Sequence, residues 1–301
     1  MKTLNMLIRR NNKLFFKDKG MIFTSLITPL ILLVLFVTFL GKVYHESFSS
    51  VLPASFNVSE KLINGCVGGQ LFSSLLAVCC VTVAFCSNML MVHDKVSGAR
   101  KDMMITPVKP STMALGYYIS TLINTLIICV IATAASFIYI ATVGWYISFS
   151  DVLLLFFDVF ILVMFGTALS SIVNLFLSTQ GQISAVGTIV SSGYGFISGA
   201  YMPISSFGTG LQKVLSFLPG TYGTSMIRNH ALRGVFSEMR DQGFPDEIVE
   251  NIKDSIDCNL YFFDKKVSVS EMYIIMISSV ILLVCIYILL NVLMNKKVKQ
   301  S

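Results

Sequence analysis

Long runs without charged side chains alternate with short polar segments along most of the chain. The first run, residues 21–40, has no charged side chain, and at ~1.5 Å of rise per helical residue it matches the ~30 Å core of a bilayer. Later runs are also long enough to predict an all-α integral membrane protein with one transmembrane domain over residues 1–301. The six predicted spans are residues 21–40, 66–91, 113–142, 151–177, 183–200 and 272–294.

The composition excludes a water-soluble enzyme. Of the 301 residues, 54% are hydrophobic and 13% are charged, whereas soluble domains average roughly 45–50% and 25%. The net charge of +6 is modest, and we expect it to reflect cytoplasmic loops rather than nucleic-acid binding. The seven cysteines form no metal-binding pattern, so no metal or other cofactor is expected in this chain. Pairing of Cys66 with Cys258 stays open.

Positive charge is distributed unevenly between the two sides of the predicted topology. The segments expected inside are 1–20, 92–112, 178–182 and 295–301, and those expected outside are 42–65, 143–150 and 201–269. The inner segments hold 13 Lys and Arg in 53 residues, and the outer segments hold 9 in 101. Because cytoplasmic loops carry an excess of Lys and Arg, we predict a multi-pass protein of the cytoplasmic membrane with both termini in the cytoplasm.

Two regions outside the spans carry helical patterns. Residues 1–19 place apolar side chains among Lys and Arg, which favours an amphipathic interfacial helix over a disordered basic flank. In the region 201–269, short apolar pieces at 204–218 and 221–232 are split by Pro219-Gly220. Such short pieces at membrane depth are typical of re-entrant helices. The rest of this region predicts an amphipathic helix outside the membrane.

The longest internal segment on the predicted cytoplasmic side is 93–111. It combines a charged turn, an apolar cluster at Met103, Met104 and Ile105, and a proline-bounded return to the membrane at Pro107 and Pro110. Methionine adapts to irregular pockets and charges orient a partner, so this pattern suits a docking surface for a cytosolic protein. A solvated loop whose methionines contact the membrane surface explains the composition equally well.

Small residues recur every four positions in the fifth predicted span, at Gly187, Ser191, Gly195 and Gly199. Such a ridge allows another helix to approach closely. Packing within the chain is the commoner reason for this pattern, and a dimer interface or a translocation path is the alternative.

Asp158 is the only carboxylate well inside a predicted span. An acid inside the membrane is costly and marks a functional site by default, with pairing to a basic residue of a neighbouring helix as the structural alternative. Without a second carboxylate or a basic partner in the spans, we expect Asp158 to be a poor proton relay.

Two motifs carry a resemblance to ABC-2 type transporter permeases. Asp94-Lys95-Val96-Ser97-Gly98, followed by Met104-Ile105-Thr106-Pro107-Val108, resembles the E-K-x-x-G and L-x-x-T-P-V segments of that family, with Asp94 in place of Glu. Pro203, Pro219, Tyr222 and Arg228 are similar to its P and P-x-T-Y-x5-R region. Gly220 departs from the bulky residue common there, and residues 235–269 look like an added segment.

The resemblance implies a permease that dimerises and docks two cytosolic ATPase subunits, which bind ATP and Mg²⁺. It implies an export mechanism of alternating access driven by ATP. The chain has no G-x-x-x-x-G-K-[ST] loop, so ATP hydrolysis is expected in the partner. The residues expected to couple to the ATPase are Asp94, Lys95, Gly98, Arg100, Lys101, Met104, Ile105 and Pro107.

Two other functions fit six spans less well. A secondary transporter without an ATPase usually shows internal repeats and several polar residues at the membrane midplane, and the sequence has no clear repeat. A membrane-embedded enzyme needs convergent catalytic groups, and none cluster in the sequence. The transported substrate, and whether the second permease chain is identical or related, are open at this point.

Overall fold

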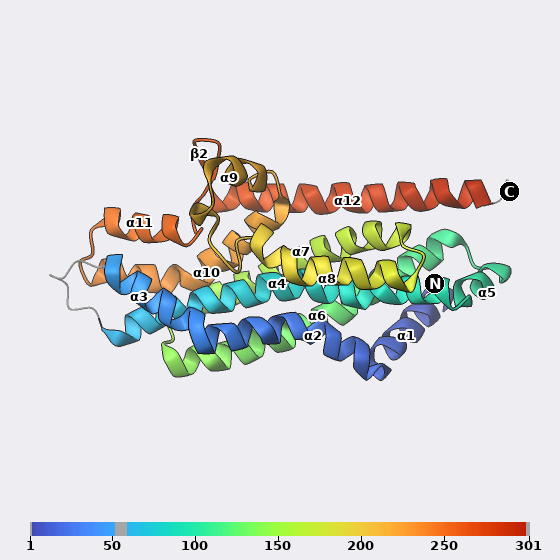
Figure 1. Ribbon diagram of the computed structural model, residues 1–301, viewed down its shortest axis with the longest axis horizontal. Helices are drawn as coiled ribbons and strands as arrows, with labels where there is room; N and C mark the ends of the chain where they lie inside the picture. Colours follow the sequence, from blue (N-terminus) through green and yellow to red (C-terminus); the bar gives the residue numbers. More distant parts are fainter. Residues whose placement is uncertain (1, 52–58, 299–301) are drawn as a thin grey trace.

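The computed structural model describes residues 2–51 and 59–298, which form a bundle of long helices with one small hairpin (Figure 1). The helices of the first half are α1 (Lys2–Lys17), α2 (Lys19–Leu35), the π-helical turn η1 (Phe36–Leu40), α3 (Gly41–Val51), α4 (Glu60–Val96), α5 (Ala99–Ile105) and α6 (Pro110–Val143). The second half contains α7 (Phe149–Phe176), α8 (Gln180–Ile197), the 3-10 turn η2 (Ile204–Ser206), α9 (Thr209–Leu215), α10 (Pro219–Asp241), α11 (Asp246–Ser255), β1 (Leu260–Phe262), β2 (Lys265–Val267) and α12 (Val269–Val298).

Five helices in the described residues are long and apolar enough to cross a membrane. They are Lys19–Glu46, Glu60–Val96, Pro110–Val143, Phe149–Phe176 and Val269–Leu293. The all-α membrane architecture predicted from the sequence is therefore confirmed. The fifth predicted span corresponds to α8, an 18-residue helix rich in Gly and Ser, and its crossing of the membrane stays a prediction.

The start of α1, the end of α12 and helix α5 lie at one end of the bundle, which we call the α5 end (Figure 1). Helix α11 lies at the opposite end, which we call the α11 end. Helix α8 runs from the α5 end toward the α11 end. This arrangement agrees with an even number of crossings.

Helix α4 forms the centre of the bundle and is buried along most of its length. It packs against α7, α6, α10 and α2. Small residues at the contacts allow close approach: a side chain at Gly166 would meet the Cys80 carbonyl oxygen at 2.9 Å, and Gly69 faces Leu232. Small residues at helix contacts let the backbones of two helices approach closely inside a bilayer.

The predicted N-terminal helix is present as α1, which ends at Lys17 because Asp18 caps the next helix. The Asp18 carboxylate accepts hydrogen bonds from the N–H groups of Gly20 and Met21 at 2.9 and 3.1 Å. Helix α1 packs against α6 and buries Phe15. Its placement on the membrane surface stays a prediction.

The region 201–269 differs from the sequence prediction in two respects. The second short piece is longer than expected, because Pro219 starts a continuous helix, α10, that runs through residue 232 to Asp241. Residues 260–267 form an antiparallel hairpin that the sequence did not predict. The amphipathic helix expected outside the membrane is α11, which buries Val249 and Ile252.

Candidate functional site

At the α5 end, a polar junction joins α1, α4 and α6. The Arg10 guanidinium donates hydrogen bonds to both oxygens of the Asp94 carboxylate at 2.7 and 2.9 Å, and the Tyr117 hydroxyl donates to the same carboxylate at 2.6 Å. The bonded Asp94 carboxylate raises the pKa of Arg10. This bidentate pairing has the geometry that favours arginine over lysine. Asp94 therefore ties the N-terminal helix to the central helix.

Lys95 also binds within the chain. Its ammonium donates to the carbonyl oxygens of Asn174, Leu175 and Leu177 at 3.0, 2.7 and 2.8 Å. These carbonyls belong to the end of α7, where a helix leaves its last acceptors unpaired and favours a cation. Asp94 and Lys95, two of the predicted coupling residues, are thus held inside the junction rather than presented to a partner.

Helix α5 projects at the α5 end as the predicted coupling segment. Gly98 precedes it with φ of 85°, a left-handed backbone conformation that glycine adopts without strain. Lys101 and Pro107 are exposed, and Ile105 keeps 85% of its surface exposed. The exposed side of α5 is therefore mixed apolar and basic.

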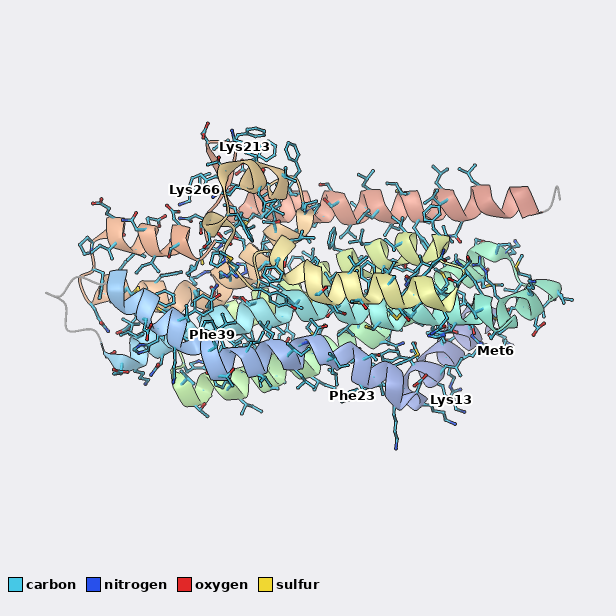
Figure 2. The ribbon with its side chains drawn as sticks, viewed as in Figure 1. Met6, Lys13, Phe23, Phe39, Lys213 and Lys266 are labelled. Carbon is cyan, nitrogen blue, oxygen red and sulfur yellow. The ribbon has the colours of Figure 1, made fainter. Side chains whose placement is uncertain are left out.

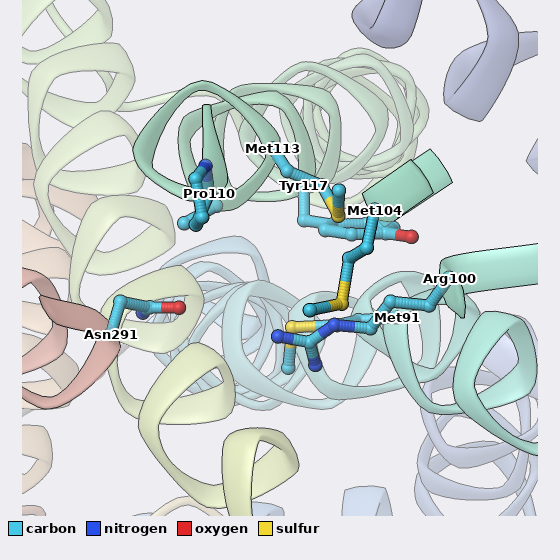
Figure 3. Close-up of a pocket in the computed structure, with 8 residues that line it drawn as sticks. Met91, Arg100, Met104, Pro110, Met113, Tyr117 and Asn291 are labelled. Carbon is cyan, nitrogen blue, oxygen red and sulfur yellow. The ribbon is translucent and has the colours of Figure 1, made fainter. Parts of the chain in front are cut away.

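Met104 packs partly against its own chain, while 40% of its surface stays exposed. Figure 3 shows Arg100 and Met104 pointing toward Met91 in a pocket between α4, α5, α6 and α12. The pocket holds about 10 Å³, which is the space of about one water molecule. Met104 thus contacts its own chain and still exposes part of its side chain, and Ile105 is the more exposed apolar residue of the two.

Asp158 lies in a buried polar cluster formed by α7, α10 and α12. Its Oδ2 is 2.6 Å from Nδ1 of His230, and the Tyr273 hydroxyl donates to its Oδ1. Next to this cluster, Arg233 pairs with Asp151 at 3.0 Å. Asp158 has a histidine partner from outside the predicted spans, because α10 brings His230 from 72 positions away. His230 lies within the predicted piece 221–232, but no local pattern in the sequence places that piece against residues 151–177.

Arg228 organises the turn between α8 and α10. It is fully buried and donates to the Gly199 carbonyl oxygen at 3.0 Å and to the Ser74 hydroxyl at 3.3 Å. It also lies 3.7 Å from Asp257, whose carboxylate accepts a hydrogen bond from the N–H of Ile204 at 2.6 Å. Arg228 therefore has a structural role, because its contacts join α10 to α4, to the turn after α8 and to Asp257.

The other residues of this motif fix the start of α10. Pro203 directly precedes η2, and Pro219 is the first residue of α10. The Tyr222 hydroxyl donates to the Ser216 carbonyl oxygen at 2.6 Å. A side chain at Gly220 would lie 2.8 Å from the Tyr194 hydroxyl, which explains why the bulky residue common in the resembling family is absent here.

The small residues of α8 do not form one continuous helix-packing ridge. Gly195 packs against Tyr201 of the following turn, and Gly199 ends the helix with φ of 72°. The Tyr201 hydroxyl donates to the Ser191 carbonyl oxygen at 3.3 Å. Gly187 faces the end of the Met89 side chain. Packing within the chain, the commoner of the two explanations, describes these contacts.

A wide groove separates α8 from α2 along the side of the bundle. Its volume is about 1100 Å³, and Gly187 and Ser191 line it together with Thr24, Thr28 and Ile31. Its walls combine apolar side chains with hydroxyl groups. The groove opens on the outside of the chain.

Cys66 and Cys258 are both buried as free thiols in one apolar cluster, so no disulfide joins them. Burial raises the pKa of Cys258 to about 12, which leaves its thiol protonated and unreactive at neutral pH. Among the described residues, no group of three His, Cys, Asp or Glu side chains could hold a metal ion.

Comparison with known proteins gives one match. A family model described as ABC-2 family transporter protein matches residues 46–294 of the chain. No curated protein and no solved structure matches it. The matched range contains the predicted coupling segment, the Asp158 cluster and the Arg228 turn, and it leaves out α1 and α2.

Proposed function

The chain belongs to the ABC-2 family of transporter proteins and is a membrane-spanning permease component, and we propose that it is half of an ATP-driven exporter. In this proposal, two permease chains assemble with two cytosolic ATPase subunits. The ATPases bind ATP and Mg²⁺, and the α5 end faces the cytoplasm of the cell whose membrane holds the complex. The transported substrate is not assigned.

The observation that carries the proposal is the way in which α5 connects to the bundle. Helix α5 is exposed at the end of the molecule, and it follows directly on α4, the central helix. A force applied to α5 would therefore act on α4 and, through the Arg10–Asp94 pair, on α1. Such a chain of packed elements is what an ATPase needs to change the arrangement of the spans.

The α2–α8 groove supports a dimer with a path between its chains. Among the residues that line the groove, α2 exposes Ile31 and Leu35, and α8 exposes Phe196. A second permease chain against this side would cover these apolar residues and convert an open groove of about 1100 Å³ into an enclosed path. The hydroxyl groups of Thr24, Thr28 and Ser191 would then line part of it.

The test is a substitution at the most exposed apolar residue of α5. Ile105→Asp should leave membrane insertion unchanged, because the residue lies outside every candidate span. We expect it to abolish copurification with a subunit that mass spectrometry identifies as an ABC ATPase, together with permease-stimulated ATP turnover. A buried charge without a partner at an interface costs several kcal/mol.

Asn251→Asp is the matched control, since it places the same charge on an exposed position of α11 at the opposite end. It should keep full ATPase binding and turnover. Wild-type copurification and turnover in Ile105→Asp would overturn the docking role of α5.

The Asp158–His230 pair favours a second candidate function, a carrier that moves protons with its substrate. Buried carboxylate and histidine groups at membrane depth are the usual components of proton relays. The two candidates differ in their energy source. Transport that stops when ATP is depleted and continues when the proton gradient is dissipated supports the exporter, and the reverse result supports the carrier.

A further inference from the structure

A compact apolar surface lies outside the candidate spans, on α9 and the hairpin. We call it the aromatic tip and define it as Val214, Phe217, Phe262 and Phe263. These side chains keep 60%, 62%, 40% and 47% of their surfaces exposed. None of them belongs to a helix long enough to cross the membrane. Exposed apolar surface gathered in one place indicates an interaction site.

The three rings of the aromatic tip contact one another while each stays exposed. Phe217 lies edge-to-face with Phe262 and Phe263, with ring centroids 5.2 and 6.0 Å apart. Phe262 and Phe263 are 5.0 Å apart. Lys213 places its ammonium 5.7 Å from the centre of the Phe263 ring. The tip is therefore an aromatic cluster with a cation beside it.

The opposite face of α9 is polar, which gives the tip one apolar side. Thr209, Gln212 and Ser216 line a cavity of about 480 Å³ between α9, α11 and the hairpin. The Gln212 amide donates to the Phe207 carbonyl oxygen at 2.7 Å. Lys213 and Phe263 also line this cavity, whereas Val214, Phe217 and Phe262 do not. These last three side chains therefore form an apolar side away from the cavity.

Ion pairs hold the hairpin to its neighbours. Lys266 pairs with Glu250 of α11 at 2.7 Å, and Lys265 pairs with Glu271 of α12 at 3.1 Å. Partial burial acts to raise the pKa of Glu250, but hydrogen bonds from Lys253, Lys266 and Asn259 lower it to about 2. Glu250 is therefore charged at neutral pH and keeps the hairpin attached to α11.

The start of α12 sets the level of the tip relative to the membrane. The hairpin ends at Val267, and α12 starts at Val269. Glu271 marks the headgroup level, because a charged side chain is costly in the hydrocarbon core. From Ile274 onward, α12 exposes apolar residues such as Ile281. Figures 1 and 2 show α9 and the hairpin projecting from the bundle on the side of α12.

We propose that the aromatic tip inserts into the headgroup region of the phospholipid leaflet at the α11 end, with the Lys213 ammonium on a lipid phosphate. The tip continues the lipid-facing surface of α12 at the level where membrane proteins concentrate aromatic side chains. Lysine extends its charge to the phosphates while its stem stays in the apolar layer. The tip thereby anchors the segment 201–269 to the bilayer.

A second permease chain fits this surface less well. The groove assigned above to the dimer is lined by α2, α4, α8 and the turn after α8, and no residue of the aromatic tip lines it. The proposal requires only that α12 spans a bilayer. It is independent of the ATPase partner. The aromatic tip can therefore prove wrong while the proposed function holds, and the proposed function can prove wrong while the tip holds.

The test uses tryptophan fluorescence, since Trp145 is the one tryptophan of the chain. In a Trp145→Phe background, Phe262→Trp reports on the tip, and Asn251→Trp on α11 reports on a site expected in water. Each full-length variant is reconstituted into phosphatidylcholine vesicles containing lipid brominated at shallow or deep acyl positions. Acrylamide serves as the quencher from the aqueous side.

We expect shallow bromines to quench the tryptophan at 262 several-fold more than the one at 251, and more than deep bromines do. Acrylamide should show the opposite order. Phe217→Trp in the same background should repeat the pattern of position 262, which guards against a local effect of one substitution on the hairpin. Quenching of both tip positions by acrylamide alone would overturn the proposal. Protection of both from acrylamide and bromines would also overturn it, because a protein would then cover the tip.

Discussion

Each end of the bundle has an arginine that joins neighbouring elements, and the two arginines do so in different ways. Arg228, toward the α11 end, is fully buried and joins α10 to α4, to the turn after α8 and to the segment after α11. Arg10, at the α5 end, has a third of its side chain exposed and binds mainly the Asp94 carboxylate. Arg228 donates to two backbone carbonyl oxygens and two serine hydroxyls away from water. Arg10 binds mainly one carboxylate, and water can reach part of its side chain.

The difference teaches which end of the molecule is suited to move. A buried arginine surrounded by carbonyl oxygens fixes the elements around it, because each partner loses a hydrogen bond if it leaves. Asp94 is also buried, but its partner Arg10 keeps a third of its side chain in water, so we expect this pair to open at a smaller cost than the Arg228 contacts. We therefore infer a rigid α11 end and an adjustable α5 end, which is the end that carries the exposed helix α5.

The largest expected effect is at the rigid end. Arg228→Met should destabilise the purified protein by about 3–5 kcal/mol, because it leaves Asp257 as a buried charge without its partner. Thermal unfolding in detergent measures the change. Arg240→Met is the matched control, since the side chains of Arg240 and of its partner Asp246 are both exposed, and it should lower the midpoint far less. Equal midpoints for the two variants would contradict a rigid end built on Arg228.

The Asp158 cluster should give the next largest effect, because it attaches α12 to α7 and α10. Asp158→Leu removes the acceptor of His230 and Tyr273 and should cost about 1–3 kcal/mol. Asp158→Asn keeps an oxygen acceptor and should cost less. Thermal unfolding of both variants, with transport measured in vesicles, separates structure from proton chemistry. Full stability with loss of transport in Asp158→Asn would instead indicate a functional carboxylate.

At the adjustable end, we expect a small effect on stability and a large one on coupling. Asp94→Asn weakens a partly exposed ion pair and should cost about 1 kcal/mol. ATP turnover of the assembled complex should persist while transport per ATP falls, because α1 is no longer held to α4. Tyr117→Phe removes one hydrogen bond to the same carboxylate and should show a milder form. Unchanged transport per ATP in Asp94→Asn would show that the Arg10–Asp94 pair does not take part in coupling α5 to α1.

The smallest expected effect tests the packing at the start of α10. Gly220→Ala places a methyl group 2.8 Å from the Tyr194 hydroxyl, and such overpacking typically costs about 1 kcal/mol. Tyr194→Phe removes that hydroxyl, which is buried without a hydrogen-bond partner, so the double variant should regain stability. A double-mutant cycle from thermal unfolding provides the measurement. Additive losses would show that the two residues do not meet as described.

The sequence alone determined the membrane class and most of the helices. Runs such as 66–91 and 151–177 contain few or no charges, and a bilayer accepts such runs only as helices because every backbone group must be bonded internally. The motifs around Gly98 and Arg228 indicated the family that the match over residues 46–294 shows. Amphipathic spacing predicted α1 and α11, since one-sided burial leaves a helical period in the sequence.

Only the tertiary structure decided which polar side chains meet. His230 reaches Asp158 and Arg10 reaches Asp94 because separate helices cross at those levels, and no local pattern encodes the relative height of two helices. The contact of Met104 with Met91 and the greater exposure of Ile105 depend on how α5 packs on the bundle. Periodicity records which face of a helix is apolar, but the partner of each face is set by the packing of the whole bundle.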